Sequence, residues 1–242
     1  MTQVNVFTRP SFWWRVALVA AGLLGILSGS HRLNFYTAQS AVLTVGYFGG
    51  VVYWMVRRRT TEPAAPRLRG AVTLWILVTG LVSHFVNNHG ESPIPGLLDG
   101  DPASLVARRS VFLLHYVLPV MVFVDWVAFG PRRVSPWRDL PLWLIFPLFY
   151  VVTSIARANL LPAAPDRYPY AFLNPTAHGY GWVAWWLVKL TIGITLLGAL
   201  LLGLDRLLAR PGHSSPSDGP AGADDPAGPW PVSDATASAP AA

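Results

Sequence analysis

The chain has 242 residues, of which 52% are hydrophobic and 12% are charged. Soluble domains carry about 25% charged residues, so this composition is typical of an integral membrane protein. The absence of cysteine excludes a disulfide framework, thiol catalysis and thiolate metal sites. The net charge of +6 does not indicate a nucleic-acid-binding protein. The cations lie at the ends of apolar stretches, where membrane topology and anionic lipid headgroups explain them.

Six apolar stretches are predicted to be transmembrane helices: residues 13–30, 38–57, 70–88, 109–130, 139–157 and 182–204. At a rise of about 1.5 Å per residue, each is long enough to cross a hydrocarbon core of about 30 Å. The predicted fold class is all-α, a polytopic membrane protein whose transmembrane domain spans residues 1–209. Residues 210–242 have no periodic apolar face, and we expect them to form a disordered tail.

The arginines predict the topology. If the N-terminus is inside, twelve arginines fall in inner segments, and five fall in outer ones: Arg32, Arg108, Arg109, Arg157 and Arg167. The positive-inside rule then predicts that both termini are cytoplasmic, so the tail is cytoplasmic as well. Lys189 is the only lysine, and alanine, proline and glycine are abundant. This composition suggests a GC-rich genome, and we expect a multi-pass protein of a bacterial plasma membrane.

Polar residues at membrane depth are the candidates for chemistry, because they are costly in hydrocarbon. Thr37 begins the second span. It fits either a helix N-cap or a reactive hydroxyl beside the unpaired N–H groups and the positive end of the helix dipole. His115 lies in the fourth span, about six residues or 9 Å below its outer end. It fits either a histidine bonded to a neighbouring carbonyl or a catalytic base.

Lys189 and Asp125 are the charged residues deepest in the predicted spans. Lys189 lies near the middle of the sixth span, and Asp125 lies toward the inner end of the fourth. Their axial separation of about 8 Å favours a structural ion pair. Helical side chains lean toward the helix N-terminus, however, so Lys189 could instead point toward His115.

Other polar and aromatic residues gather at the outer ends of the spans. His84, in the third span, lies at a depth similar to that of His115, and the residues after it, Asn87, Asn88 and His89, are typical of an interface. The loop 167–175, which includes Tyr170, precedes the sixth span. Its aromatic residues predict either an interfacial belt or a rigid lid over an outward-facing cleft.

Three short motifs occur in a familiar order: Phe35-Tyr36-Thr37, His115-Tyr116-Val117-Leu118-Pro119 and Tyr168-Pro169-Tyr170-Ala171-Phe172-Leu173. With the order of the spans, they give a pattern that resembles the androgen-induced protein family and its bacterial six-span relatives, over about residues 12–207. The spacing departs from the family pattern by one residue, since His115 stands four residues before Pro119. One residue is about 100° of helix rotation. We therefore expect either a local helix adjustment here or a different base.

The animal members of this family are threonine hydrolases that cleave fatty acid esters of hydroxy fatty acids. The resemblance implies that Thr37 is the nucleophile and His115 the base of a hydrolase of lipid-like carboxylic esters. It implies no metal or organic cofactor, and its partners would be membrane lipids and the ester. Backbone N–H groups of the second span would bind the oxyanion. Five residues are expected to assist them or to contact the substrate: Asn34, Gln39, His84, Tyr170 and Lys189.

Two other functions remain open from the sequence. His84 and His115 lie at matching depth on adjacent spans, which suits the axial ligands of a haem b-binding electron carrier. A non-catalytic membrane scaffold or regulator is the other alternative. It predicts that Thr37→Ala and His115→Ala leave every phenotype unchanged.

Overall fold

The structure is a computed structural model that describes residues 5–29, 33–94 and 102–209; the predicted tail lies outside the described residues. The described part is helical and contains no strand. Six of its helices are long and apolar enough to cross a membrane: Pro10–Ser28, Tyr36–Arg58, Pro66–Asn87, Leu105–Ala128, Trp137–Leu160 and Pro175–Leu208. These correspond to the six predicted spans, so the all-α class is confirmed, as is the presence of six helices that are long and apolar enough to cross a membrane. The last helix begins seven residues earlier than predicted, at Pro175.

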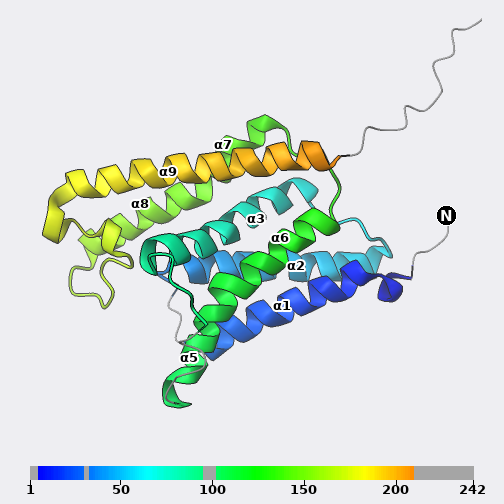
Figure 1. Cartoon of the computed structure of the whole chain (residues 1–242), viewed down its shortest axis with the longest axis horizontal. Helices are drawn as coiled ribbons and strands as arrows, with labels where there is room; N and C mark the ends of the chain where they lie inside the picture. Colours follow the sequence, from blue (N-terminus) through cyan, green and yellow to red (C-terminus); the bar gives the residue numbers. More distant parts are fainter. Residues whose placement is uncertain (1–4, 30–32, 95–101, 210–242) are drawn as a thin grey trace, which may run out of the picture. The chain divides into compact units, whose positions relative to one another are not determined.

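Four helices form a packed group: α1 (Pro10–Ser28), α2 (Tyr36–Arg58), α3 (Pro66–Leu81) and α6 (Leu118–Ala128) (Figure 1). Two glycines let α1 approach its neighbours, because a Cβ at Gly22 would lie 2.4 Å from Val45 and a Cβ at Gly25 would lie 2.5 Å from Leu114. Buried apolar side chains of all four helices fill the centre of the group, among them Leu18, Phe48, Ile76 and Leu118. The start of α2, where Thr37 lies, is therefore held in a packed setting.

The remaining long helices adjoin α3 (Figure 1). The segment after α6 contains the short helix α7 (Leu140–Trp143), then α8 (Ile145–Leu160) and α9 (Pro175–Leu208). Helix α9 contacts α3 and α7, whereas α8 and α9 make few direct contacts with each other. Space is therefore left between α8 and α9.

Two of the long helices contain a π-helical segment at one end of the bundle. Helix α3 continues as the π-helical segment Val82–Asn87. Helix α5 (Pro102–Phe112) leads into α6 through the π-helical segment Leu113–Val117. Such wide turns are rare and frequently occur at functional sites.

A buried charge cluster ties the other end of the bundle together. The Asp125 carboxylate lies 2.8 Å from Arg15 Nε and 2.9 Å from Arg69 Nη2, and both Arg15 and Asp125 are 0% exposed. Arg15 also donates to the carbonyls of Thr61 and Phe129. Helices α1, α3 and α6 are thereby joined through one carboxylate.

This cluster overturns the expected pairing of Asp125 with Lys189. Lys189 is exposed on α9, and its Nζ lies 3.5 Å from the centroid of the Trp186 ring. Depth along a helix does not give the face from which each side chain projects. The cation–π contact with Trp186 partly replaces the water that the ammonium group lacks at that position.

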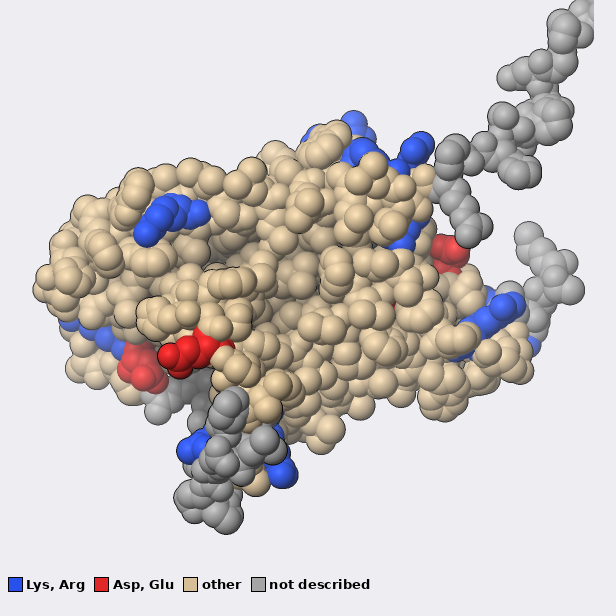
Figure 2. All heavy atoms as spheres, viewed as in Figure 1, with Lys and Arg blue, Asp and Glu red and all other residues tan. Residues whose placement is uncertain are grey.

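The outer surface matches a protein with apolar spans. On the face shown in Figure 2, charged side chains gather toward the ends of the helices, and a broad uncharged region lies between them. Large exposed apolar side chains lie along the spans, including Leu24, Val152 and Leu196. Such a surface is unfavourable in water and suits contact with lipid.

Candidate active site

Thr37 lies at the N-terminus of α2, where the first backbone N–H groups have no partner within the helix. The N-cap of α2 is Phe35, which has an extended backbone, and the first intrahelical bond runs from Gln39 N to Phe35 O. The N–H groups of Tyr36, Thr37 and Ala38 therefore precede the α2 ladder. Thr37 is the second helical residue and makes no capping bond, so the N-cap interpretation of this residue is wrong.

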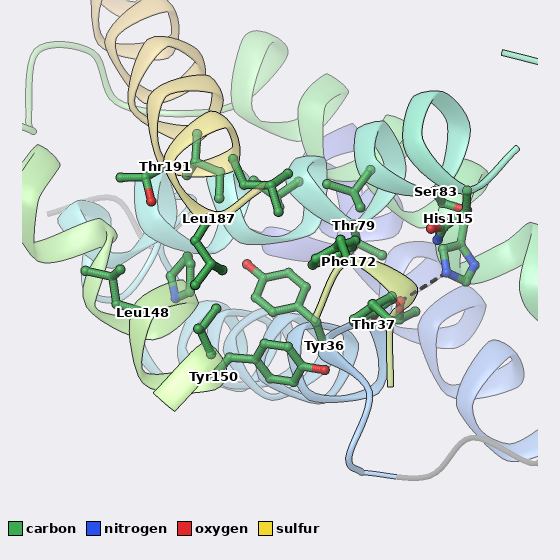
Figure 3. Close-up of a pocket in the computed structure, with 18 residues that line it drawn as sticks. Tyr36, Thr37, Thr79, Ser83, His115, Leu148, Tyr150, Phe172, Leu187 and Thr191 are labelled. Atoms are coloured by element: carbon green, nitrogen blue, oxygen red, sulfur yellow. Dashed lines mark hydrogen bonds between the residues drawn. The ribbon is translucent and has the colours of Figure 1, made fainter. Parts of the chain in front are cut away.

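The Thr37 hydroxyl meets the imidazole of His115. Thr37 Oγ1 lies 3.0 Å from His115 Nε2 (Figure 3), and Thr37 is 6% exposed. The other ring nitrogen, Nδ1, lies 2.8 Å from the carbonyl oxygen of Val111. A carbonyl oxygen can only accept, so we assign the imidazole proton to Nδ1. Nε2 then accepts the hydrogen bond of the Thr37 hydroxyl, which is the arrangement that a general base requires.

The π-helical segment Leu113–Val117 determines the orientation of the His115 imidazole. Pro119 cannot donate to the carbonyl four residues earlier, that of His115, and its ring would clash with that carbonyl in a regular α-helix. The N–H of Leu118 bonds instead to Leu113 O, five residues back. This wider turn is a local helix adjustment, one of the two alternatives that the one-residue shift in spacing left open. It turns His115 toward α2.

Gly80 of α3 makes room for the wide turn. A Cβ added at Gly80 would lie 2.9 Å from the His115 carbonyl oxygen and 3.3 Å from Pro119. A glycine at this position allows the widened backbone of the α5–α6 helix to approach α3 closely. The position of His115 therefore depends on two small sequence features, Pro119 and Gly80.

Thr37 and His115 lie where two cavities meet. The first, which we call the apolar cavity, has about 750 Å³ of empty space and is lined by side chains of α2, α3, α8 and α9, including Val78, Leu148 and Leu187. Thr37 and His115 are at one end of this cavity, and Leu148 and Thr191 are at the other (Figure 3). Since Leu148 is 50% exposed, the far end lies near the outer surface between α8 and α9.

The second cavity, which we call the loop cavity, has about 1170 Å³ of empty space. It is lined by Phe35, Asp166 and Pro169 from connecting segments, and it also contains Thr37 and His115. The hydroxyl–imidazole pair thus borders the apolar cavity on one side and the loop cavity on the other. Such a site can hold a chain-like molecule whose polar group lies between the two cavities.

Tyr170 lines both cavities beside the pair. Its ring stacks on Phe172 at an interplanar angle of 5° and meets the Phe35 ring edge-on. Burial raises the pKa of Tyr170 above its ordinary value, and hydrogen bonds with Thr37 and with the backbone of Tyr36 act in the opposite direction. The phenol is therefore neutral at physiological pH. Tyr170, in the loop expected to form either an interfacial belt or a lid, thus lies beside the hydroxyl–imidazole pair.

Two expected oxyanion helpers lie elsewhere. The Gln39 side chain donates to the carbonyl of Leu33 at 2.7 Å, so it fastens the segment before α2. The Asn34 carbonyl accepts a hydrogen bond from the Tyr150 hydroxyl at 3.0 Å. Neither Asn34 nor Gln39 lines the two cavities. The structure therefore does not bring either side chain to the reacting group: Gln39 fastens the segment before α2, and Asn34 Nδ2 is buried without a hydrogen-bond partner among the described residues.

His84 does not orient His115, since the Val111 carbonyl does so. His84 Nδ1 lies 3.4 Å from the Tyr116 hydroxyl, which also accepts from Asn88. His84 and His115 both line a shallow groove between α3 and α6. Lys189 is likewise separate from the site, because it does not line either cavity.

Asn87 was treated as an interfacial residue, yet it lines both cavities. Ser83 and Thr79, one and two turns earlier, line the apolar cavity as well. The signal that could have found them is their spacing of four residues, which places all three on one face of the third span.

No protein-family model, curated protein or solved structure matches this chain.

Proposed function

We propose that this protein is a membrane-embedded hydrolase of lipid-like carboxylic esters, with Thr37 as nucleophile and His115 as general base. The observation that carries the proposal is the 3.0 Å contact between Thr37 Oγ1 and His115 Nε2, with Nδ1 anchored on the Val111 carbonyl. A threonine hydroxyl needs an adjacent base to attack a carbonyl, and this geometry supplies one.

The reaction would proceed in two halves. Thr37 Oγ1 bonds to the ester carbonyl carbon while its proton moves to His115 Nε2. The bond from that carbon to the alcohol oxygen then breaks, and the imidazolium gives its proton to the leaving alcohol. A water molecule, deprotonated by His115, attacks the acyl-threonine, and Thr37 regains its proton as the acid is released.

The negative charge that develops on the carbonyl oxygen needs donors. The N–H groups at the start of α2 are suitable, and the helix dipole favours an anion there. Tyr170 lines both cavities beside Thr37. Because this phenol remains neutral, it can donate a hydrogen bond to the oxyanion, so Tyr170 serves as a further stabilising group.

The two cavities favour a lipid-like ester. The apolar cavity would accept an acyl chain from the bilayer through the space between α8 and α9, where Leu148 is exposed. The loop cavity would receive water and release the alcohol. We place both termini in the cytoplasm and the site toward the outer leaflet of a bacterial plasma membrane, as the distribution of arginines predicts.

The haem alternative is less well supported by the geometry. Both ring nitrogens of His115 have protein contacts, Nε2 with Thr37 and Nδ1 with Val111. Axial ligation would break one of these bonds. The scaffold alternative makes no use of the hydroxyl–imidazole pair, and the test below separates it from the hydrolase.

The test is ester hydrolysis by detergent-purified wild type, Thr37→Ala and His115→Ala, with long-chain simple and branched esters. We expect turnover by the wild type and a loss of at least about 10³-fold in each variant. Matched controls of the same residue types outside the cavities are Thr195→Ala and His178→Ala, which should retain activity. Turnover that persists in Thr37→Ala, or a wild type that hydrolyses none of the esters, would overturn the proposal.

A further inference from the structure

The apolar cavity is lined by a buried hydroxyl group that the reaction does not use and that lacks a hydrogen-bond partner within the described residues. Tyr36 is 7% exposed and lines this cavity, and its hydroxyl has no hydrogen-bond partner within the described residues. Two other buried side-chain atoms there lack a partner, Asn34 Nδ2 and Trp186 Nε1, but neither residue lines the apolar cavity. The Tyr36 hydroxyl is therefore the unpaired group that a molecule in the cavity would meet.

The direction of the side chain strengthens this point. Figure 3 shows the Tyr36 ring projecting into the cavity, with its hydroxyl directed toward Leu187 and away from Thr37 and His115. The ring is held by Phe146, at a centroid distance of 5.1 Å, and by Tyr150, at 5.2 Å. A chain that extends from Thr37 toward Thr191 would pass this hydroxyl.

A buried hydroxyl without a hydrogen-bond partner is unfavourable, and a plain hydrocarbon chain in the cavity would leave it without a partner. A chain that carries an oxygen at the right position would satisfy it. Sites built to bond a polar group discriminate strongly against analogues that lack the group, because the protein atom is then left unpaired. The cavity walls include the apolar side chains of Val78, Leu187 and Ile194, and also polar ones such as Ser83 and Thr191, so the Tyr36→Phe variant is needed to identify the group that binds the oxygen.

We propose that the Tyr36 hydroxyl is a specificity-determining group that binds an oxygen atom borne part-way along the ligand's chain. The apolar cavity would then prefer oxygen-bearing acyl chains to plain ones of the same length. This inference rests on the proposed function to the extent that the cavity is taken to hold the acyl chain of the substrate. Its test is a binding experiment, so it does not depend on turnover.

The probes are a plain long-chain fatty acid and a positional series of the same acid with one keto group along the chain. Each displaces a fluorescent fatty acid from the full-length protein in nanodiscs, in a Thr37→Ala background that prevents turnover. We expect the best-placed keto acid to bind about tenfold more tightly than the plain acid. Substitution Tyr36→Phe should reduce this ratio to about one, and the position of the best keto group would report the depth of the hydroxyl.

The matched control is Tyr53→Phe, which removes a hydroxyl from the same helix at a side chain that is 69% exposed. It should leave the ratio unchanged. A melting experiment accompanies both variants: Tyr36→Phe should not lower the melting temperature, because its hydroxyl has no partner to lose. The inference is overturned if no keto acid binds better than the plain acid, if none of the acids binds, or if Tyr36→Phe keeps the preference.

The two proposals fail in different ways. A preference abolished by Tyr36→Phe in a protein that hydrolyses no ester would reject the hydrolase and retain the Tyr36 site. Hydrolysis that requires Thr37, combined with equal binding of all the acids, would reject the Tyr36 site alone.

Discussion

The Nδ1 atom of His115 lies 2.8 Å from the carbonyl oxygen of Val111, four residues earlier on the same helix. This bond places the proton on the ring nitrogen that faces away from Thr37, so the nitrogen facing Thr37 carries a lone pair. Many hydrolases use a carboxylate to orient the histidine, whereas here a backbone carbonyl does so. A neutral carbonyl stabilises an imidazolium less than a carboxylate would.

Substitution Gly80→Ala should lower kcat by about 10–100-fold. The added Cβ would lie 2.9 Å from the His115 carbonyl oxygen, so the π-helical segment must move, and displacements of about 1 Å can cost 10²-fold in rate. Steady-state hydrolysis kinetics check this result. The control is Gly193→Ala, where a Cβ meets no atom within 4 Å. Equal kcat values in the two variants would contradict the role assigned to Gly80.

Substitution Leu187→Trp should fill part of the apolar cavity. We expect kcat/KM to fall at least about tenfold for long-chain esters and to change little for short-chain ones, because only a long chain needs the space beyond Tyr36. The measurement is kcat/KM across a series of acyl lengths. Leu196→Trp, at a 65% exposed position on the same helix, is the control and should leave the profile unchanged. A parallel loss at every chain length would show that the chain lies elsewhere.

Substitution Asp125→Asn should destabilise the protein by about 3–5 kcal/mol, because it leaves the buried guanidinium groups of Arg15 and Arg69 without their carboxylate. Thermal unfolding in detergent measures the effect as a lower melting temperature. Glu62→Gln removes a carboxylate from an exposed position and should have little effect. If the two variants melted at the same temperature, the charge cluster would not stabilise the packing of α1, α3 and α6.

Tyr170 predicts a pH dependence of stability. Burial raises the pKa of Tyr170 in the folded state above the value of about 10 that an unfolded tyrosine has. As the pH rises through about 10, the unfolded chain loses this proton before the folded protein does, so stability decreases with increasing pH. Melting temperatures between about pH 8 and 11 should therefore fall more steeply for wild type than for Tyr170→Phe. Parallel slopes would contradict the prediction.

The sequence predicted much of the fold, because a transmembrane span depends on length and apolar composition alone. All six spans appeared with similar bounds. The sequence did not predict the face from which each polar side chain projects, and this explains the error with Asp125. Arg15 and Arg69 were counted as charges at the span ends, yet both fold inward to that carboxylate. Rotation about a helix axis is set by packing, which a hydropathy pattern does not contain.

The candidate site was predicted in part. Thr37 and His115 were identified by their depth and by a motif resemblance, and the structure places them in contact. A local helix adjustment was one of two alternatives that the spacing left open, and the structure has a π-helical segment there. The supporting residues were not predicted: Gln39 and Asn34 are close to Thr37 in sequence, but the Gln39 side chain bonds to Leu33 and Asn34 lines neither cavity. Proximity along the chain was a poor guide to which groups face the cavity.

The most direct test of the central claim, that His115 activates Thr37 as a nucleophile, is covalent labelling with an organophosphonate that bears a long alkyl chain. Peptide mass spectrometry would then locate the adduct. We predict one phosphonylated peptide with the modification on Thr37, retained in Thr37→Ser and lost in both Thr37→Ala and His115→Ala. An adduct on another residue, or equal labelling of Thr37 in wild type and His115→Ala, would contradict the account.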